Sequence, residues 1–354
     1  MTNSVSTIQA SASLPRWYTP AALVGSFSIA LATFTVSSSN SEAGGPNLIA
    51  VVLFGFALYM IGTYVASRSV EGKRRATDRI VTGWVTAAFA LAVIPLLSLT
   101  WTVFEKGLNR LDIDFFTMSM RNVVGEGGGA LHAIVGTLQL TGIATLISVP
   151  LGIMTAIYLV EYGRGRLARS VTFFVDVMTG IPSIVAGLFA FSLFLILLGP
   201  ASAINGFAGA ISLAVLMTPV VVRATEEMLR IVPNELREAS YALGVPKWLT
   251  IVKVVIPTAL AGIATGVIIA IARVIGETAP LLLAAGFTTS MNYNPFAEKM
   301  MTLPVFVFTS YANQGSDVQS YIDRAWAGAL TLMLIVMALN LIARIISKLF
   351  SPKG

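Results

Sequence analysis

Long apolar stretches constrain the fold of this sequence more than any other feature. A helix needs ~20 apolar residues to cross the hydrocarbon core of a bilayer. With 56% hydrophobic and 11% charged residues, the chain of 354 residues has too few polar groups to cover the surface of a soluble protein of its size. We therefore expect an all-α polytopic membrane protein. About eight stretches qualify as spans: 21–39, 48–66, 80–104, 131–160, 174–198, 206–222, 256–286 and 325–346.

The positions of lysine and arginine predict which side of the membrane each connecting segment faces. Basic residues gather between residues 67 and 79, between 161 and 173, between 223 and 257, and after 343, whereas the short segments SEAGGPN and GPASAING contain none. Basic loops are retained in the cytoplasm. This alternation predicts that both termini and the charged segment 223–257 are cytoplasmic.

The polar segment 67–79 divides the chain into an N-terminal part and a larger core. We expect a disordered cytoplasmic tail at 1–19, an accessory two-helix hairpin with its basic loop at 20–79, a membrane core at 80–346 and a cytoplasmic tail at 347–354. A cleaved signal peptide is the alternative for the first apolar stretch. It is disfavoured because the preceding region contains one basic residue, Arg16, and no clear cleavage site follows the stretch.

Several classes of function are excluded by composition. The chain has no cysteine, so disulfides, thiolate metal sites and cysteine nucleophiles are absent. Its single histidine, His132, leaves little scope for a metal site or a catalytic triad, and we place it at the outer end of a span. The net charge of +6 is spread over separate segments, unlike a nucleic-acid-binding surface. We expect no catalytic residue, metal, cofactor or nucleic-acid partner.

The charged segment 223–257 lies between predicted spans and must therefore face water. Asn234 is a suitable N-cap for a short helix, and Glu235 is an acid in its first turn, where the helix dipole favours negative charge. Gly244 is typical of a left-handed helix stop, and a second helix is predicted from Lys247. The segment is either a solvated linker or a helix-turn-helix element that docks on a partner.

Spacing within this segment favours docking. Glu238-Ala239-Ser240 is followed by three residues, then Gly244, then nine residues and Val254-Val255-Ile256-Pro257. The pattern resembles the coupling loop of ABC importer permeases, E-A-A, Gly and I-x-L-P, with substitutions of similar size. The resemblance implies that the loop docks in a groove of a partner ATPase. The coupling candidates are Asn234, Glu235, Glu238, Ala239, Ser240, Gly244 and Pro257.

The chain lacks the phosphate-loop motif G-x4-GK[ST], so the resemblance assigns ATP to that partner. Further strings narrow the family. GTLQLT, GIPSIVAGLF, RATEEMLRIVP, ARVIGETAPLL and LPVFVF, between residues 125 and 346, together resemble the PstA-type permease subunits of phosphate-specific ABC importers. This resemblance implies a six-helix type I ABC importer core in the plasma (inner) membrane. It also implies a PstC-type permease partner, two ATP-binding subunits and an extracytoplasmic phosphate-binding protein.

Two charges in the apolar stretch 256–286 are candidates for the substrate pathway. Arg273 and Glu277 are four residues apart, so in a continuous helix they share one face and can pair. Each costs ~2.5–3.5 kcal/mol at mid-membrane, which favours a cavity or partner over lipid. They form either a dry ion pair or a substrate contact. In the second case the guanidinium binds a tetrahedral oxyanion, and the carboxylate accepts the proton of hydrogen phosphate and disfavours sulfate.

Gly276 and Pro280 are candidates for a break in this helix, with Thr278 beside the freed carbonyl groups. Gly180-Ile181-Pro182 similarly predicts a hinge or an interrupted helix before Ser183, whereas a packing kink is the alternative. Hydroxyl groups at Thr137, Thr141, Thr145 and Ser148 form a stripe that is typical of helix packing. We retain Thr278, Ser183, Thr137 and Thr141 as pathway candidates.

Asp176 is expected near the cytoplasmic surface, either solvated or paired with Arg169.

As a whole, the sequence predicts a permease subunit that imports inorganic phosphate and is coupled to an ATPase through residues 238–257. Two alternatives remain, a permease for another oxyanion and an ion-coupled secondary transporter that needs no ATPase. A membrane-embedded enzyme is disfavoured because the spans contain no recognisable catalytic arrangement.

Overall fold

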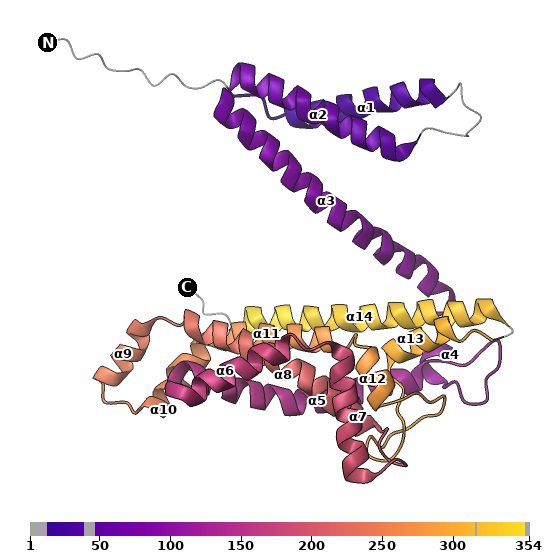
Figure 1. Ribbon diagram of the computed structural model, residues 1–354, viewed down its shortest axis with the longest axis vertical. Coiled ribbons are helices and arrows are strands. Elements are labelled where there is room, and N and C mark those ends of the chain that lie inside the picture. The colour runs from indigo at the N-terminus through magenta and orange to yellow at the C-terminus, as the bar shows by residue number, and fades with distance from the viewer. Residues whose placement is uncertain (1–12, 39–46, 316, 351–354) are drawn as a thin grey trace. The chain divides into compact units, whose positions relative to one another are not determined.

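The computed structural model describes residues 13–38, 47–315 and 317–350, and every regular element in these ranges is a helix (Figure 1). Seven helices are long and apolar enough to span a membrane, or up to eight if one bent pair counts as a span. The prediction of an all-α polytopic protein is confirmed. Most of the predicted tail at 1–19, and residues 351–354 of the second tail, lie outside the described residues. The chain forms two compact units, Met1–Thr100 and Trp101–Gly354.

The first unit contains the predicted hairpin, α1 (Tyr18–Ser38) and α2 (Leu48–Val70), and most of α3 (Lys73–Gly107). Glu71 organises the turn between α2 and α3. Its carboxylate accepts hydrogen bonds from the Leu14 amide at 2.8 Å, from the Ser67 hydroxyl at 2.7 Å and from Arg79 Nε at 2.7 Å. The Arg79 guanidinium, more than the other two donors, lowers the pKa of Glu71 to about 2.

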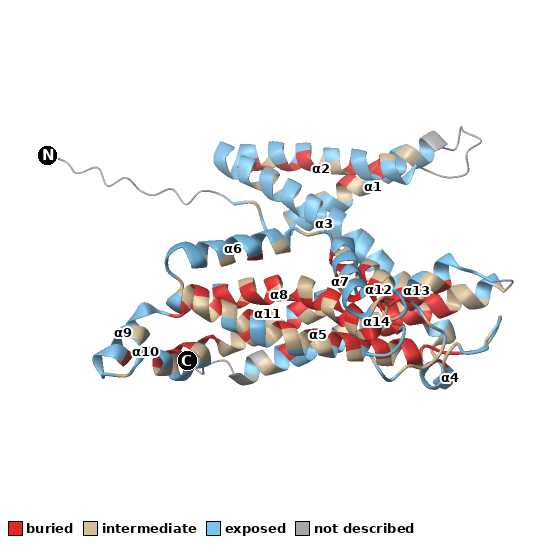
Figure 2. Cartoon of the chain, turned by 60° about the horizontal axis from the view of Figure 1, so that its bottom comes forward, coloured by how far each residue is buried: buried red, intermediate tan, exposed pale blue. Residues whose placement is uncertain are grey.

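The second unit is organised around four long helices: α5 (Leu131–Ile157), α8 (Gly206–Ile231), α11 (Ile256–Val274) and α14 (Val318–Phe350). Buried residues concentrate on α5, α8 and α11 (Figure 2). Small side chains permit this packing. A Cβ atom on Gly152 of α5 would lie 2.7 Å from the Val221 side chain of α8, so glycine allows the two helices to approach closely.

The predicted span 174–198 is not one helix. It comprises part of α6 (Gly165–Thr179) and α7 (Ser183–Leu198), which meet at an angle of 109°. Pro182 has an extended conformation, with φ −58° and ψ 138°, and lacks the amide needed to continue the backbone ladder. The predicted interruption at Gly180-Ile181-Pro182 is therefore confirmed.

The predicted span 256–286 is also divided. The helix begins as α10 (Lys247–Thr250), passes through a π-helical turn, η3 (Ile251–Val255), and continues as α11 to Val274. A separate short helix, α12 (Ala279–Ala284), follows. A second π-helical turn, η2 (Tyr158–Tyr162), ends α5. The turn η3 packs against the short helix α9 (Asn234–Ala242) and against α10. The turn η2 contacts both helices through Glu161.

The longer connecting segments contain η1 (Leu108–Arg110), α4 (Ile113–Thr117) and α13 (Leu303–Ala312). His132 lies at the end of a span, as expected, but it is buried there. It is 2% exposed, and its ring meets the Phe306 ring edge-on at 5.8 Å between centroids. The histidine follows the start of α5 by one residue, and α13 covers it there, which apolar periodicity does not reveal.

Candidate functional site

The α9–α10 element, residues 232–250, forms the helix-turn-helix predicted from sequence. Gly244 has a φ of +75°, its amide donates to the Tyr241 carbonyl at 2.9 Å, and the Val245 amide donates to the Ser240 carbonyl at 3.2 Å. This pair of bonds is the Schellman arrangement, which satisfies the last carbonyl groups of a helix. The predicted glycine stop is confirmed.

Two coupling candidates have internal roles in the α9–α10 element. Asn234 is the first residue of α9 rather than its N-cap, which is Pro233, and its Oδ1 atom accepts from Arg237 at 3.3 Å. The Ser240 hydroxyl is buried and lies 2.8 Å from the Thr250 hydroxyl. This bond fastens α9 to α10, so Ser240 stabilises the fold of the element.

The outer surface of the α9–α10 element combines acidic and large apolar side chains. Glu235, Glu238 and Ala239 are exposed. Leu243 is 83% exposed and Trp248 is 60% exposed, although both are apolar residues at the two ends of one turn. Exposed apolar groups rimmed by polar residues mark interaction surfaces. This surface therefore has the composition that is typical of an interaction surface.

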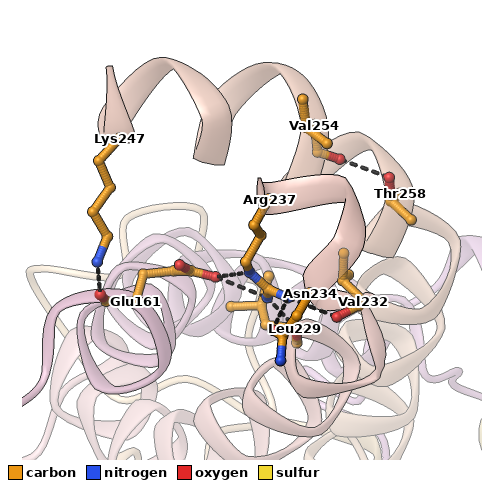
Figure 3. A network of polar contacts seen from close by, with 8 residues as sticks. All are labelled: Glu161, Leu229, Val232, Asn234, Arg237, Lys247, Val254 and Thr258. Carbon is orange, nitrogen blue, oxygen red and sulfur yellow. Dashed lines mark hydrogen bonds and ion pairs between the residues drawn. The ribbon is translucent and has the colours of Figure 1, made fainter. Parts of the chain in front are cut away.

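The inner side of the element is held by an ion pair that the sequence analysis missed (Figure 3). Nε and Nη2 of Arg237 lie 3.1 and 2.9 Å from Oε1 of Glu161, and the two side chains are 13% and 5% exposed. Arg237 also donates to the carbonyl groups of Leu229 at 2.9 Å and Val232 at 2.6 Å. Lys247 donates to the Glu161 carbonyl. Only the charge of Glu161 at the end of the apolar stretch 131–160 signalled this contact.

Segment 223–257 is not a loop from its beginning, because α8 continues to Ile231. The extra turns are supported by charge pairs. Buried Glu226 accepts from both Arg223 and Arg230 at 2.6 Å. Arg223 also pairs with Asp176, whereas Arg169 donates to the carbonyl of Gly165. Of the two alternatives for Asp176, pairing with Arg169 is wrong, because α6 packs beside α8 and brings a different arginine close to the acid. The Asp176 side chain is 60% exposed, as the solvated alternative predicted.

Arg273 and Glu277 do not form a dry ion pair, which was one of the two alternatives that the sequence left open. The helix α11 ends at Val274, and the Glu277 amide closes a turn onto the Val274 carbonyl at 3.1 Å. The two residues consequently leave the common face that a continuous helix would give them. Arg273 is exposed and Glu277 is partly buried, and neither side chain has a hydrogen bond or ion pair within the described part of the chain. Both remain available to a ligand or a second chain.

The other pathway candidates fall into two groups. Thr137 and Thr141 are buried, and the Thr137 hydroxyl donates to the Ala133 carbonyl and accepts from the Leu303 amide, both at 2.7 Å. Ser183 begins α7, and Thr278 precedes α12; both are partly buried at helix breaks. Elsewhere on the stripe, Ser148 donates to the Ala214 carbonyl of α8 at 3.1 Å. The stripe therefore serves largely to pack α5.

Comparisons with known proteins agree with this architecture. The family model described as "Binding-protein-dependent transport system inner membrane component" matches residues 148–353. The phosphate transport system permease protein PstA 1 of Mycobacterium tuberculosis (strain ATCC 25618 / H37Rv) is 47% identical over 285 residues, 80% of this chain and 91% of that protein. The phosphate transport system permease protein PstA of Haemophilus influenzae is 37% identical over 273 residues, 77% of this chain and 94% of that protein.

Two solved structures share the fold. A chain of the bacterial alginate ABC transporter, in complex with a periplasmic protein, has a TM-score of 0.53 at 15% identity and covers 78% of this chain and 98% of its own. A chain of the inward-facing MetNI methionine ABC transporter has a TM-score of 0.52 at 19% identity and covers 63% and 96%. The chain belongs to the family of inner membrane components of binding-protein-dependent transport systems. Within that family, it is a member of the PstA group of permeases.

Proposed function

We propose that this chain is the transmembrane permease subunit of an ATP-driven importer of inorganic phosphate. The observation that carries the proposal is the α9–α10 element, which is anchored by Arg237 on its inner side and exposes acidic and apolar groups on its outer side. Membership of the PstA group supports phosphate as the transported ion, because the relatives are named phosphate transport permeases.

The partners follow from the same family. A PstC-type permease would complete the translocation pathway, two ATP-binding subunits would supply energy, and an extracytoplasmic binding protein would deliver phosphate. The exposed apolar face of the α9–α10 element suits a groove on an ATP-binding subunit. The proposal places both chain termini and this element in the cytoplasm, as the distribution of basic residues predicts.

Helix α11 offers a direct route from the ATPase to the substrate. Pro257 and Arg273 lie on this helix, about 16 residues or roughly 24 Å apart. Closure of the ATPase dimer would displace the α9–α10 element, and a rigid tilt of α11 would carry that motion to Arg273. Arg273 suits contact with phosphate because its guanidinium is unpaired within the described part of the chain and matches the geometry of an oxyanion. Glu277, Thr278 and Ser183 are proposed to lie along the same pathway.

Reconstitution of the complete complex tests this function. The chain, its second permease, the ATP-binding subunits and the binding protein are placed in liposomes, and uptake of labelled phosphate is measured with and without ATP. We expect uptake to require ATP. Gly244→Val places a β-branched side chain at a φ of +75°, so it should deform the turn and abolish co-purification of the ATP-binding subunit. Uptake driven by an ion gradient without that subunit would identify a secondary transporter instead.

A further inference from the structure

We propose that Glu161 is a positioning residue that couples helix α5 to the α9–α10 element and thereby provides a second path for conformational change. This inference rests on the proposed function. The chain connects the element directly to α8 on one side and to η3 and α11 on the other. Helix α5 has no such connection, since Glu161 and Arg237 are 76 residues apart in sequence. Its link to the element depends on non-covalent contacts.

Glu161 receives a cation from each helix of the element. Arg237 of α9 binds its carboxylate, and Lys247 of α10 binds its backbone carbonyl (Figure 3). The second contact follows from the helix terminus, because the last carbonyl groups of a helix lack internal partners and attract positive charge. Lys247 also lies 4.9 Å from the centre of the Tyr162 ring. Arg237 and Lys247 therefore both hold the turn that ends α5.

Arg237 joins three helix ends at one buried point. Its guanidinium binds Glu161 at the end of α5 and the carbonyl groups of Leu229 and Val232 at the end of α8, while its backbone belongs to α9. The Glu161 side chain is 5% exposed, so water screens this pair little. A displacement of α9 therefore has to move α5 as well or break the buried hydrogen bonds of the Arg237 guanidinium.

The opposite end of α5 is also attached to another segment. Thr137 accepts a hydrogen bond from the Leu303 amide at 2.7 Å, where α13 begins. Thr137 and Glu161 are about 24 residues apart, roughly 36 Å at helical rise. Helix α5, together with η2, in which Glu161 lies, thus links the α9–α10 element to the segment that begins α13. This path runs beside α11, which ends near Arg273.

The complete reconstituted complex tests the role of Glu161 through the number of phosphate ions imported per ATP hydrolysed. Glu161→Gln should still bind the ATP-binding subunits and hydrolyse ATP, but this ratio should fall about tenfold, within the range of typical coupling between sites. Glu161→Asp, which keeps the charge, should give an intermediate ratio. Glu227→Gln is the matched control, because Glu227 is an exposed acid on the neighbouring end of α8, and its ratio should equal that of the wild type.

An unchanged ratio in Glu161→Gln would overturn the inference. Failure of the wild-type complex to import phosphate with ATP would instead overturn the proposed function, so the two failures are distinguishable. A second variant keeps the inference testable if the Glu161→Gln complex assembles poorly. The chain contains no cysteine, so Glu161→Cys with Arg237→Cys introduces its only thiol pair. A short, cleavable thiol cross-linker, applied in membranes before extraction, should raise the ratio several-fold over the same sample after cleavage. Equal ratios before and after cleavage would also overturn the inference.

Discussion

Arg237 in α9 and Arg273 near the end of α11 have contrasting surroundings. Arg237 is buried against Glu161 and the carbonyl groups of α8, and its donors are used within the chain. Arg273 is exposed, and no acid or carbonyl within the described ranges binds it, although Glu277 is four residues away. The difference separates two uses of charge in an apolar protein. A paired, buried charge fixes the position of an element, whereas an unpaired charge remains available for a substrate or partner.

The largest expected effect concerns stability. Arg237→Ala removes the ion-pair partner of the buried Glu161 carboxylate, since Lys247 contacts only the backbone carbonyl of Glu161. Breaking a buried pair in this way costs about 3–5 kcal/mol. Arg273→Ala removes an exposed side chain that has no partner among the described residues, and it should change the free energy of unfolding by about 0.5 kcal/mol or less. Thermal unfolding of the two variants in the same detergent measures the contrast. Equal losses would show that Arg237 and Arg273 do not differ as described.

A smaller effect, on selectivity, is expected at Glu277. In the proposed pathway its carboxylate accepts the proton of hydrogen phosphate, and a hydrogen bond to a charged group contributes about 1.5–3 kcal/mol. Glu277→Gln should therefore lower the phosphate-to-sulfate uptake ratio by about tenfold or more. The same binding protein is used with both complexes, so its own selectivity cancels when variant and wild type are compared. An unchanged ratio would remove Glu277 from the selectivity mechanism.

Features that depend on neighbouring residues were predictable from the sequence, whereas contacts between distant segments were not. Gly244 reveals its role because a positive φ at a helix end depends on neighbouring residues alone. Spacing likewise located the α9–α10 element, and Gly180 with Pro182 located the break between α6 and α7. The Glu161–Arg237 pair depends on how α5 and α8 pack, which local patterns do not specify.

The alternative of an Arg273–Glu277 ion pair is wrong for a related reason. The prediction required α11 to continue past Gly276, and the structure ends the helix at Val274. Gly276 and Pro280 had indicated a break, but hydrophobic length alone favoured a longer span. Among the pathway candidates, burial of Thr137 against Leu303 was equally hidden from sequence, because α13 lies over 160 residues further along the chain.

Phosphate uptake and thermal stability of Arg273→Gln together test whether Arg273 contacts the substrate. Arg273 is proposed to contact the substrate and not to stabilise the fold, since its guanidinium has no partner within the described chain. In the reconstituted complex, ATP-dependent phosphate uptake should fall by about tenfold or more, because one charged contact with the ion is lost. The melting temperature of the complex should stay unchanged. Unchanged uptake with a lowered melting temperature would show that Arg273 stabilises the fold and does not contact the substrate.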